Sequence, residues 1–266
     1  HGLHAFCEKP LTDTLEQAEE LVALMDAANL FVGAAFVYRG KRVVQRMMEL
    51  LRTGAIGRLH AVHIENLWDY HGWRDQALRG ERRHRALRNL GTLDCGVHHL
   101  DLARYMAGSD YDSVHAIGTI VESDNMYPDH IIMHARMRNG VLVSLEESAV
   151  WGHTAAERPR YDQSYRMLGD NGVLSASFGD WDNTRQATRL HVISGGRQWT
   201  ETVSSEKAWD DTYDQFFRVI RGDEPPHRFI ADGHDALMNM RIARDIITQC
   251  QTGAQGAPFL SRDNFD

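Results

Sequence analysis

The first 40 residues alternate between apolar runs and one amphipathic segment. Residues 3 to 7 form a short apolar run, and residues 30 to 37 form a longer one. Between these runs, apolar residues recur at the spacing of one helix face at Ala18, Leu21, Val22 and Met25. A capping box from Thr14 to Gln17 precedes this stripe. The pattern predicts strand, helix and strand, which is the unit of a parallel α/β sheet.

The rest of the chain has a different pattern. A second amphipathic helix is predicted from about residue 41 to residue 52, followed by a strand over residues 58 to 68. Residues 113 to 203 are rich in strand signals with short turns between them, such as Asn139-Gly140 and the turn from Gly169 to Gly172. Short turns imply an antiparallel sheet. Two helices with apolar stripes, near residues 209 to 220 and 236 to 250, close the chain.

The predicted fold class is α/β plus α+β: the remnant of a Rossmann-type parallel sheet, then a large, mostly antiparallel sheet packed with helices. Two strands and one helix do not form a stable sheet domain alone, so the beginning is interpreted as the tail of a larger domain. We expect residues 1–37 to be the carboxy-terminal remnant of a dinucleotide-binding domain. Residues 38–266 are expected to form the domain for substrate binding and oligomerisation.

Composition restricts the classes of function. The chain has 266 residues, 42% of them hydrophobic and 25% charged, with a net charge of −8. This acidic balance argues against general binding to nucleic acids or anionic membranes, because both need a cationic surface. No apolar run is long enough to span a bilayer. Three scattered cysteines without a Cys-x-x-Cys pair predict no disulfide framework, so we expect a protein of the reducing cytoplasm.

Two separated motifs carry candidate chemistry. Glu8-Lys9-Pro10 ends the first apolar run, and Asp94 and His98 stand four residues apart in a helix predicted from residue 92 to residue 107. Side chains four apart project from the same helix face. A lysine whose pKa is lowered, combined with such a carboxylate and imidazole, suits proton transfer to or from a hydroxyl or carbonyl group. The combination indicates alcohol or ketone redox chemistry.

Each motif also has a structural explanation. A lysine in a strand-to-helix turn is usually a surface charge, and Asp94 with His98 can be a helix-stabilising pair. His99 and Asp101 could join them in a metal site, since imidazole and carboxylate suit several divalent ions. Adjacent histidines on a helix point in different directions, so we expect no metal. Six arginines from Arg74 to Arg88 are typical of a solvated loop, or else bind an anionic or polyhydroxylated substrate.

In order and spacing, these landmarks resemble the Gfo/Idh/MocA oxidoreductases, the family of glucose-fructose oxidoreductase and inositol dehydrogenase. The stretch from His1 to Leu11 resembles the family's strand and Glu-Lys-Pro turn, and Ala34 to Arg39 resembles the strand that leaves its nucleotide domain. The pattern Asp94-x-Gly96-x-His98-x-x-Asp101 is similar to its catalytic helix, and Asp232 to Gly253 to its closing helix. The resemblance covers essentially the whole chain.

The resemblance implies a role for each matching residue. The catalytic residues would be Lys9, Asp94 and His98, with either the lysine or the histidine as the base. The residues near NAD or NADP would be Glu8, Lys9 and Pro10. The residues in contact with a small-molecule substrate would be Tyr38, Arg39, Arg74, His99 and Asp101, the last of which would also support its helix.

The sequence has no strand, GxGxxG turn and helix in succession, so the resemblance implies a chain that lacks the amino-terminal part of the nucleotide-binding domain. Such a chain should not bind NAD(P) normally. The implied activity is hydride transfer between NAD(P) and a hydroxyl or keto group of a sugar, polyol or cyclic diol. Assembly into a homodimer or homotetramer through the open antiparallel sheet is also expected.

Two alternatives remain open from the residues alone. The same acid/base groups could serve a lyase, isomerase or hydrolase that needs no nicotinamide cofactor. The chain could also be a non-catalytic, sugar-binding module that forms oligomers.

Overall fold

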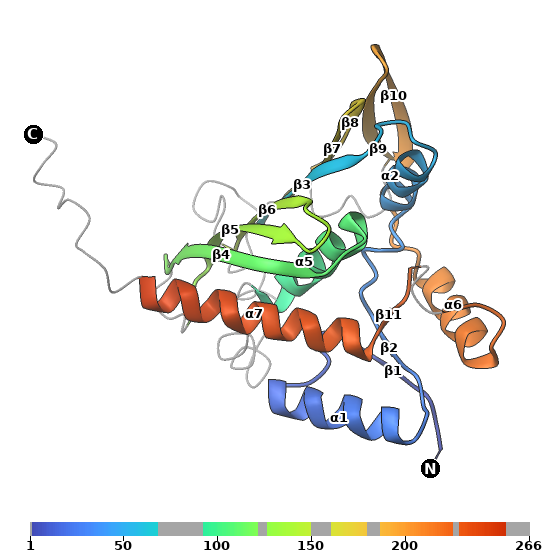
Figure 1. Cartoon of the computed structure of the whole chain (residues 1–266), viewed down its shortest axis with the longest axis vertical. Helices are drawn as coiled ribbons and strands as arrows, with labels where there is room; N and C mark the ends of the chain where they lie inside the picture. The colour runs from blue at the N-terminus through green and yellow to red at the C-terminus, as the bar shows by residue number, and fades with distance from the viewer. Residues whose placement is uncertain are drawn as a thin grey trace, which may run out of the picture.

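Two sheets of very different size organise the chain, with helices packed on one side of the larger sheet (Figure 1). The computed structural model describes residues 2–68, 93–121, 127–149, 161–179, 187–225 and 229–253. The mixed α/β architecture is the predicted one: a small parallel unit is followed by a large, mostly antiparallel sheet.

The small sheet contains β1 (Ala5–Cys7), β2 (Val32–Ala34) and β11 (Ala231–Asp232), in the order β1-β2-β11. The first two strands run parallel, as the strand-helix-strand pattern predicts, and β11 pairs antiparallel with β2. The third strand comes from the far end of the chain. The carboxy-terminal segment therefore completes the sheet that the amino terminus begins.

Helix α1 (Leu15–Ala27) connects β1 with β2 and begins at the predicted capping box. The Thr14 hydroxyl accepts a hydrogen bond from the Gln17 amide at 3.2 Å, and the Gln17 side chain accepts one from the Thr14 amide at 3.2 Å. Ala18 and Val22 are buried on its inner face. The helix is thus fixed by a local cap and by its apolar stripe.

The second strand is shorter than the apolar run predicts. Residues 30 to 37 were expected to form one strand, but β2 ends at Ala34. Beyond it, the Phe36 amide donates to the Ala34 carbonyl at 2.8 Å and the Arg39 amide to the Phe36 carbonyl at 3.1 Å, so the backbone turns. Phe36 remains buried. The apolar pattern correctly indicates that this run is largely buried, but the sheet pairing ends at Ala34 and the chain enters a turn at Val37.

The large sheet has the strand order β10-β9-β8-β7-β3-β6-β5-β4. Its strands are β3 (Leu59–Trp68), β4 (Tyr111–Thr119), β5 (His130–Met137), β6 (Leu142–Ser148), β7 (Tyr161–Gly169), β8 (Gly172–Gly179), β9 (Ala187–Ser194) and β10 (Arg197–Ser204). Only β3 and β6 pair in parallel, and the other neighbours are antiparallel. Asn139-Gly140 connects β5 with β6, and the predicted turn from Gly169 to Gly172 connects β7 with β8.

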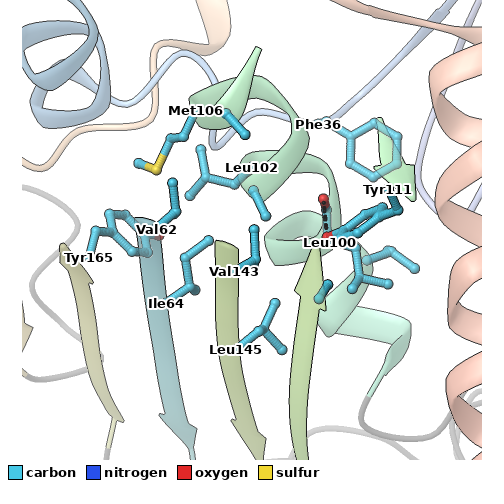
Figure 2. Close-up of a cluster of buried hydrophobic side chains, with 14 of the residues drawn as sticks. Phe36, Val62, Ile64, Leu100, Leu102, Met106, Tyr111, Val143, Leu145 and Tyr165 are labelled. Atoms are coloured by element: carbon cyan, nitrogen blue, oxygen red, sulfur yellow. Dashed lines mark hydrogen bonds between the residues drawn. The ribbon is translucent and has the colours of Figure 1, made fainter. Parts of the chain in front are cut away.

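The described fold also contains the helices α2 (Arg42–Arg52), α5 (Leu93–Ala107), α6 (Trp209–Arg221) and α7 (Gly233–Gly253). Helix α5 packs on β3 and β6, and α7 runs along β4, α5 and α1. Figure 2 shows the core between α5 and the sheet, formed by Leu100, Leu102, Met106, Val62, Ile64, Val143 and Leu145. Burial of each such side chain stabilises the fold by roughly 1.5–3 kcal/mol, which holds α5 rigidly in place.

Among the described residues, no helix combines the length and apolar character needed to cross a membrane. The same part of the chain contains no group of three or more His, Cys, Asp or Glu side chains placed to hold a metal ion.

Candidate active site

The Glu8-Lys9-Pro10 corner follows directly after β1, where the chain leaves the small sheet. The Lys9–Pro10 peptide bond is cis. The exposed Glu8 carboxylate accepts a hydrogen bond from the Lys9 amide at 3.2 Å. The corner therefore places Lys9 at the carboxyl end of a parallel strand, the end at which open α/β sheets bind ligands.

The Lys9 side chain reaches the amino-terminal turn of α5. Its Nζ donates to the Asp94 carbonyl oxygen at 2.7 Å and lies 3.7 Å from Asp94 Oδ2. The two side chains are 14% and 30% exposed, so this contact stays in reach of solvent. His98 follows Asp94 by one helical turn. The structure thus brings the three predicted catalytic residues to one place, although they come from segments 85 residues apart.

The pKa of Lys9 moves in the direction opposite to the expected one. Burial lowers it, but the influences of Cys95, Asp94 and Glu8 together outweigh burial, so the pKa of Lys9 is raised. Burial also raises the pKa of the Cys95 thiol to about 11, so that thiol is neutral near pH 7. Asp94 is then the main anionic partner, and Lys9 is an ammonium ion that can donate hydrogen bonds.

His98 lies in a more buried environment, with 8% of its surface exposed. Its ring stacks on Tyr38 with the ring centroids 4.4 Å apart, and Phe36 meets it edge-on at 5.8 Å. Burial first, and then the positive charges of Lys9 and Lys207, hold the pKa of His98 well below its usual value. Its imidazole is therefore neutral at physiological pH, as a general base must be.

Two lysines that sequence reasoning missed also approach this stack. The Lys41 Nζ lies 3.9 Å from the centroid of the Tyr38 ring, and the Lys207 Nζ lies 5.1 Å from it. Of the 29 lysines and arginines in the sequence, only three are lysines: Lys9, Lys41 and Lys207. The rarity of lysine in this sequence is the signal that could have identified Lys41 and Lys207.

A buried polar chain runs from Lys41 into the sheet. Lys41 Nζ donates to Gln163 Oε1 at 2.7 Å, and Gln163 Nε2 donates to His99 Nε2. His99 Nδ1 contacts Glu147 Oε1, and Asn66 Nδ2 donates to Glu147 Oε2 at 2.7 Å. Both ring nitrogens of His99 are thereby occupied inside the core. In this position His99 links α5 to the sheet, and its predicted contact with substrate stays a prediction.

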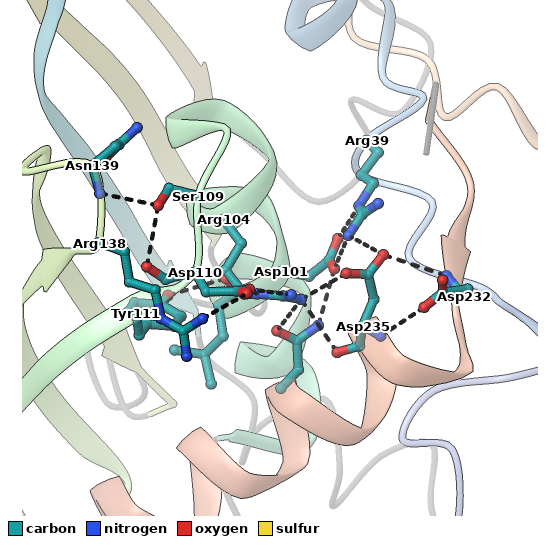
Figure 3. A network of polar contacts seen from close by, with 12 residues as sticks. Arg39, Asp101, Arg104, Ser109, Asp110, Tyr111, Arg138, Asn139, Asp232 and Asp235 are labelled. Carbon is teal, nitrogen blue, oxygen red and sulfur yellow. Dashed lines mark hydrogen bonds and ion pairs between the residues drawn. The ribbon is translucent and has the colours of Figure 1, made fainter. Parts of the chain in front are cut away.

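Arg39 and Asp101 also turn out to be supporting residues. Arg39 Nε and Nη2 each donate to the Asp101 carboxylate at 2.6 Å, and Arg39 Nη2 lies 3.1 Å from Asp235 Oδ2 (Figure 3). Asn239 donates to the same Asp101 carboxylate at 2.9 Å. Arg39 and Asp101 are 4% and 1% exposed. Their polar atoms face each other and help to fix α5 and α7, and the expected contact of these two residues with substrate stays a prediction.

The other residues predicted to contact substrate or cofactor are Tyr38, Glu8, Pro10 and Arg74. Tyr38 lies against His98 and both additional lysines, a position from which it can line a substrate site. Glu8 and Pro10 flank Lys9 in the corner. Arg74 and the rest of its arginine cluster lie outside the described residues.

Comparison with known proteins places this geometry in context. Residues 44–175 match the family model described as the GFO/IDH/MocA C-terminal domain. The myo-inositol 2-dehydrogenase of Thermotoga maritima is 25% identical over 246 residues, which cover 88% of this chain and 67% of that protein. An NADP(+)-dependent D-xylose 1-dehydrogenase of Haloarcula marismortui is 22% identical, with 92% and 65% covered. The chain therefore spans about two thirds of the length of these relatives.

Solved structures share the fold. An inositol dehydrogenase homologue of Azotobacter vinelandii, complexed with NADH and myo-inositol, superposes with a TM-score of 0.72 at 21% identity. The superposition covers 95% of this chain and 70% of the other. The family model and the relatives agree with each other, with the shared fold and with the order of the motifs. The chain belongs to the Gfo/Idh/MocA family of oxidoreductases.

Proposed function

We propose that this chain carries the catalytic and substrate site of an NAD(P)-dependent dehydrogenase that acts on a hydroxyl or keto group of a sugar, polyol or cyclic diol. The observation that supports the proposal most directly is the convergence of Lys9, from the corner after β1, with Asp94 and His98 of α5. The relatives support the same class, since they are named as dehydrogenases of myo-inositol and D-xylose.

The corner residues fit the nicotinamide end of NAD(P). Glu8, Lys9 and Pro10 follow the carboxyl end of β1 beside the parallel strand β2, and dinucleotides bind at such strand ends. The partly exposed Lys9 ammonium and Asp94 carboxylate lie at this same end of β1. When bound, the nicotinamide would accept or donate the hydride.

The residues of this chain would then divide the proton transfer between them. The Lys9 ammonium would donate a hydrogen bond to the reacting oxygen and stabilise negative charge on it. The neutral His98 imidazole would take the hydroxyl proton when the alcohol is oxidised, and return it during ketone reduction. Asp94 would hold Lys9 in position through its 2.7 Å carbonyl contact and its carboxylate. This assignment favours His98 over Lys9 as the base.

The test is turnover with added nucleotide. Purified full-length protein, in a form that includes the nucleotide-binding segment, is mixed with NAD+ or NADP+ and a panel of sugars and cyclic polyols that includes myo-inositol and D-xylose. Formation of the reduced nicotinamide is followed by absorbance. We expect Lys9→Met and His98→Asn each to lower kcat/KM by about 10²- to 10⁴-fold, the usual contribution of a positioned acid or base. Turnover of a sugar without any nucleotide would contradict the proposal and favour cofactor-independent acid/base catalysis.

A further inference from the structure

The lysines of this chain are concentrated at the proposed site. Lys9, Lys41 and Lys207 are its only lysines, and every other cationic side chain, histidine aside, is an arginine. Although the three are widely separated in the sequence, two of them lie over the Tyr38 ring and the third contacts the helix that carries His98. The three lysines of the sequence are thus gathered around the proposed site.

Two of the three ammonium groups are satisfied by the protein itself. Lys9 donates to the Asp94 carbonyl at 2.7 Å. Lys41 donates to Gln163 Oε1 at 2.7 Å and to the Tyr165 hydroxyl at 3.2 Å. Lys207 differs, because within the described part of the chain its ammonium contacts an aromatic face and no hydrogen-bond acceptor or carboxylate. As far as the described residues go, its three N–H donors are therefore available to a ligand.

The charges around Lys207 favour the binding of a further negatively charged group. Burial is the largest influence on Lys207 and lowers its pKa, and the charge of Lys9 lowers it further, while Cys95 and Glu8 act in the opposite direction. Asp94 is already paired with Lys9, and Glu8 is exposed. An anion brought to Lys207 would restore the hydrogen bonds that this ammonium loses on burial.

A second unsatisfied group lies beside the same aromatic ring. His98 Nδ1 is buried, and none of the described residues forms a hydrogen bond with it. The Tyr38 ring that stacks on this imidazole is also the ring that Lys207 approaches. Two polar groups without partners around one ring indicate a place that is completed by a bound molecule.

We propose that Lys207 binds an anionic group of the substrate, so that the substrate is a sugar acid or a sugar phosphate and not a neutral polyol. This inference rests on the proposed function and names its substrate class. Lysine suits the task because it offers a compact charge to a single carboxylate or phosphate oxygen. Lys207 is then a specificity-determining residue, while Lys9 and His98 act at the reacting oxygen.

The experiment compares a neutral sugar with its two acidic forms. With NAD+ or NADP+ present, kcat/KM is measured for D-glucose, D-glucuronate and D-glucose 6-phosphate, using the wild type, Lys207→Met and the control Arg218→Met. Arg218 is an exposed cation in the last turn of α6, so its removal changes the net charge equally. We expect one acidic sugar to be preferred over glucose by tenfold or more, on the order of one charged hydrogen bond.

The variants decide where that preference arises. Lys207→Met should lower kcat/KM for the preferred acidic sugar by about 10- to 100-fold, mainly through KM. The ratio of kcat/KM for that sugar to kcat/KM for glucose should fall by about tenfold or more. The control should behave as the wild type. A preference for glucose, or an acidic-sugar preference that survives in Lys207→Met, would overturn the inference. Whether glucuronate or glucose 6-phosphate is preferred distinguishes a carboxylate from a phosphate.

Calorimetric titration without nucleotide separates this inference from the proposed function. If no sugar is oxidised with either nucleotide, the proposed function fails, yet binding of the acidic sugars can still be measured. Binding of glucuronate or glucose 6-phosphate that Lys207→Met weakens at least about tenfold would support the anion site. Absence of anion binding, or equal binding by both proteins, would reject it.

Discussion

At the scale of single residues, the site sorts two basic side chains into opposite protonation states. The pKa of Lys9 is raised, because Asp94 and its neighbours outweigh burial, and the pKa of His98 is held low by burial and nearby lysines. One group is therefore a cation and the other a neutral base at the same pH. Pairs of titratable groups pushed apart in this way are typical of acid/base catalysis.

The lowered pKa of His98 makes a prediction about pH. The ordinary pKa of a histidine is 6.5, and the pKa of native His98 is lower. Between these two values His98 is protonated in the unfolded chain and neutral in the native protein. The free energy of unfolding should therefore fall as the pH falls below 6.5, by up to about 1.4 kcal/mol per pH unit from this group. Above 6.5 both states are neutral, and His98 contributes no pH dependence.

Urea unfolding of the wild type and His98→Asn from about pH 8 to about pH 5 measures this contribution as the difference between the two curves, which removes the effect of the other histidines. The acid limb of kcat/KM should likewise lie below pH 6.5, because the base stays neutral down to its native pKa. Parallel stability curves, or an acid limb above pH 6.5, would show that His98 is not held neutral.

At the scale of elements, buried ion pairs hold α5 against its neighbours. Arg39, in the turn after β2, contacts Asp101 in the middle of α5 and Asp235 at the start of α7. Arg104 of α5 adds ion pairs at 2.5 Å to Asp110 and at 3.0 Å to Asp235 (Figure 3). Because α5 also carries Asp94 and His98, this network fixes the distance between the helix and the Lys9 corner.

Replacing Arg39 tests the network. Arg39→Met leaves the buried Asp101 carboxylate and the partly buried Asp235 carboxylate without their shared cation, so the free energy of unfolding should fall by about 3–5 kcal/mol. The control Arg218→Met breaks exposed pairs with Asp214 and Glu224, and should leave stability almost unchanged. Urea unfolding at neutral pH measures both. Equal stability of the two variants would mean that the buried network does not hold α5.

At the scale of the whole molecule, the large sheet has one face covered by helices and one face without a described partner. Cross-strand pairing puts Leu142 beside Ala61, and Ala61 is on the face opposite to the buried Val62. Ile117 and Ile193 lie on the same open face, because the register places them in rows with Glu65 and Ala61. These apolar side chains are 71%, 53% and 38% exposed for Ile117, Leu142 and Ile193.

Self-association through this face stays a prediction. Leu142→Arg should weaken a dimer formed there by about tenfold or more, because it puts a charge in the centre of an apolar contact. The control Leu24→Arg changes a leucine on α1 that is 62% exposed, and should not affect association. Sedimentation velocity across a range of protein concentrations measures both. A monomeric wild type, or a dimer that both variants leave intact, would contradict the prediction.

Local signals in the sequence were sufficient for most elements. Thr14 and Gln17 form the predicted cap of α1, Asn139-Gly140 and Gly169 to Gly172 form the predicted hairpin turns, and the apolar stripes become helix faces. Each of these depends on neighbours a few residues away, which periodicity and turn chemistry can report. Lys9, Asp94 and His98 could be selected because their motifs are local as well.

What the sequence by itself determined, then, is the order of elements and three candidate catalytic residues. Only the tertiary structure decided which polar residues face each other in the core: Arg39 joins Asp101 across 62 residues, and Asn66 joins Glu147 across 81. The physical reason is that a buried charge must find its partner wherever the packed sheet and helices bring one within reach, and no spacing along the chain records that meeting. The approach of Lys207 to Tyr38 was decided in the same way.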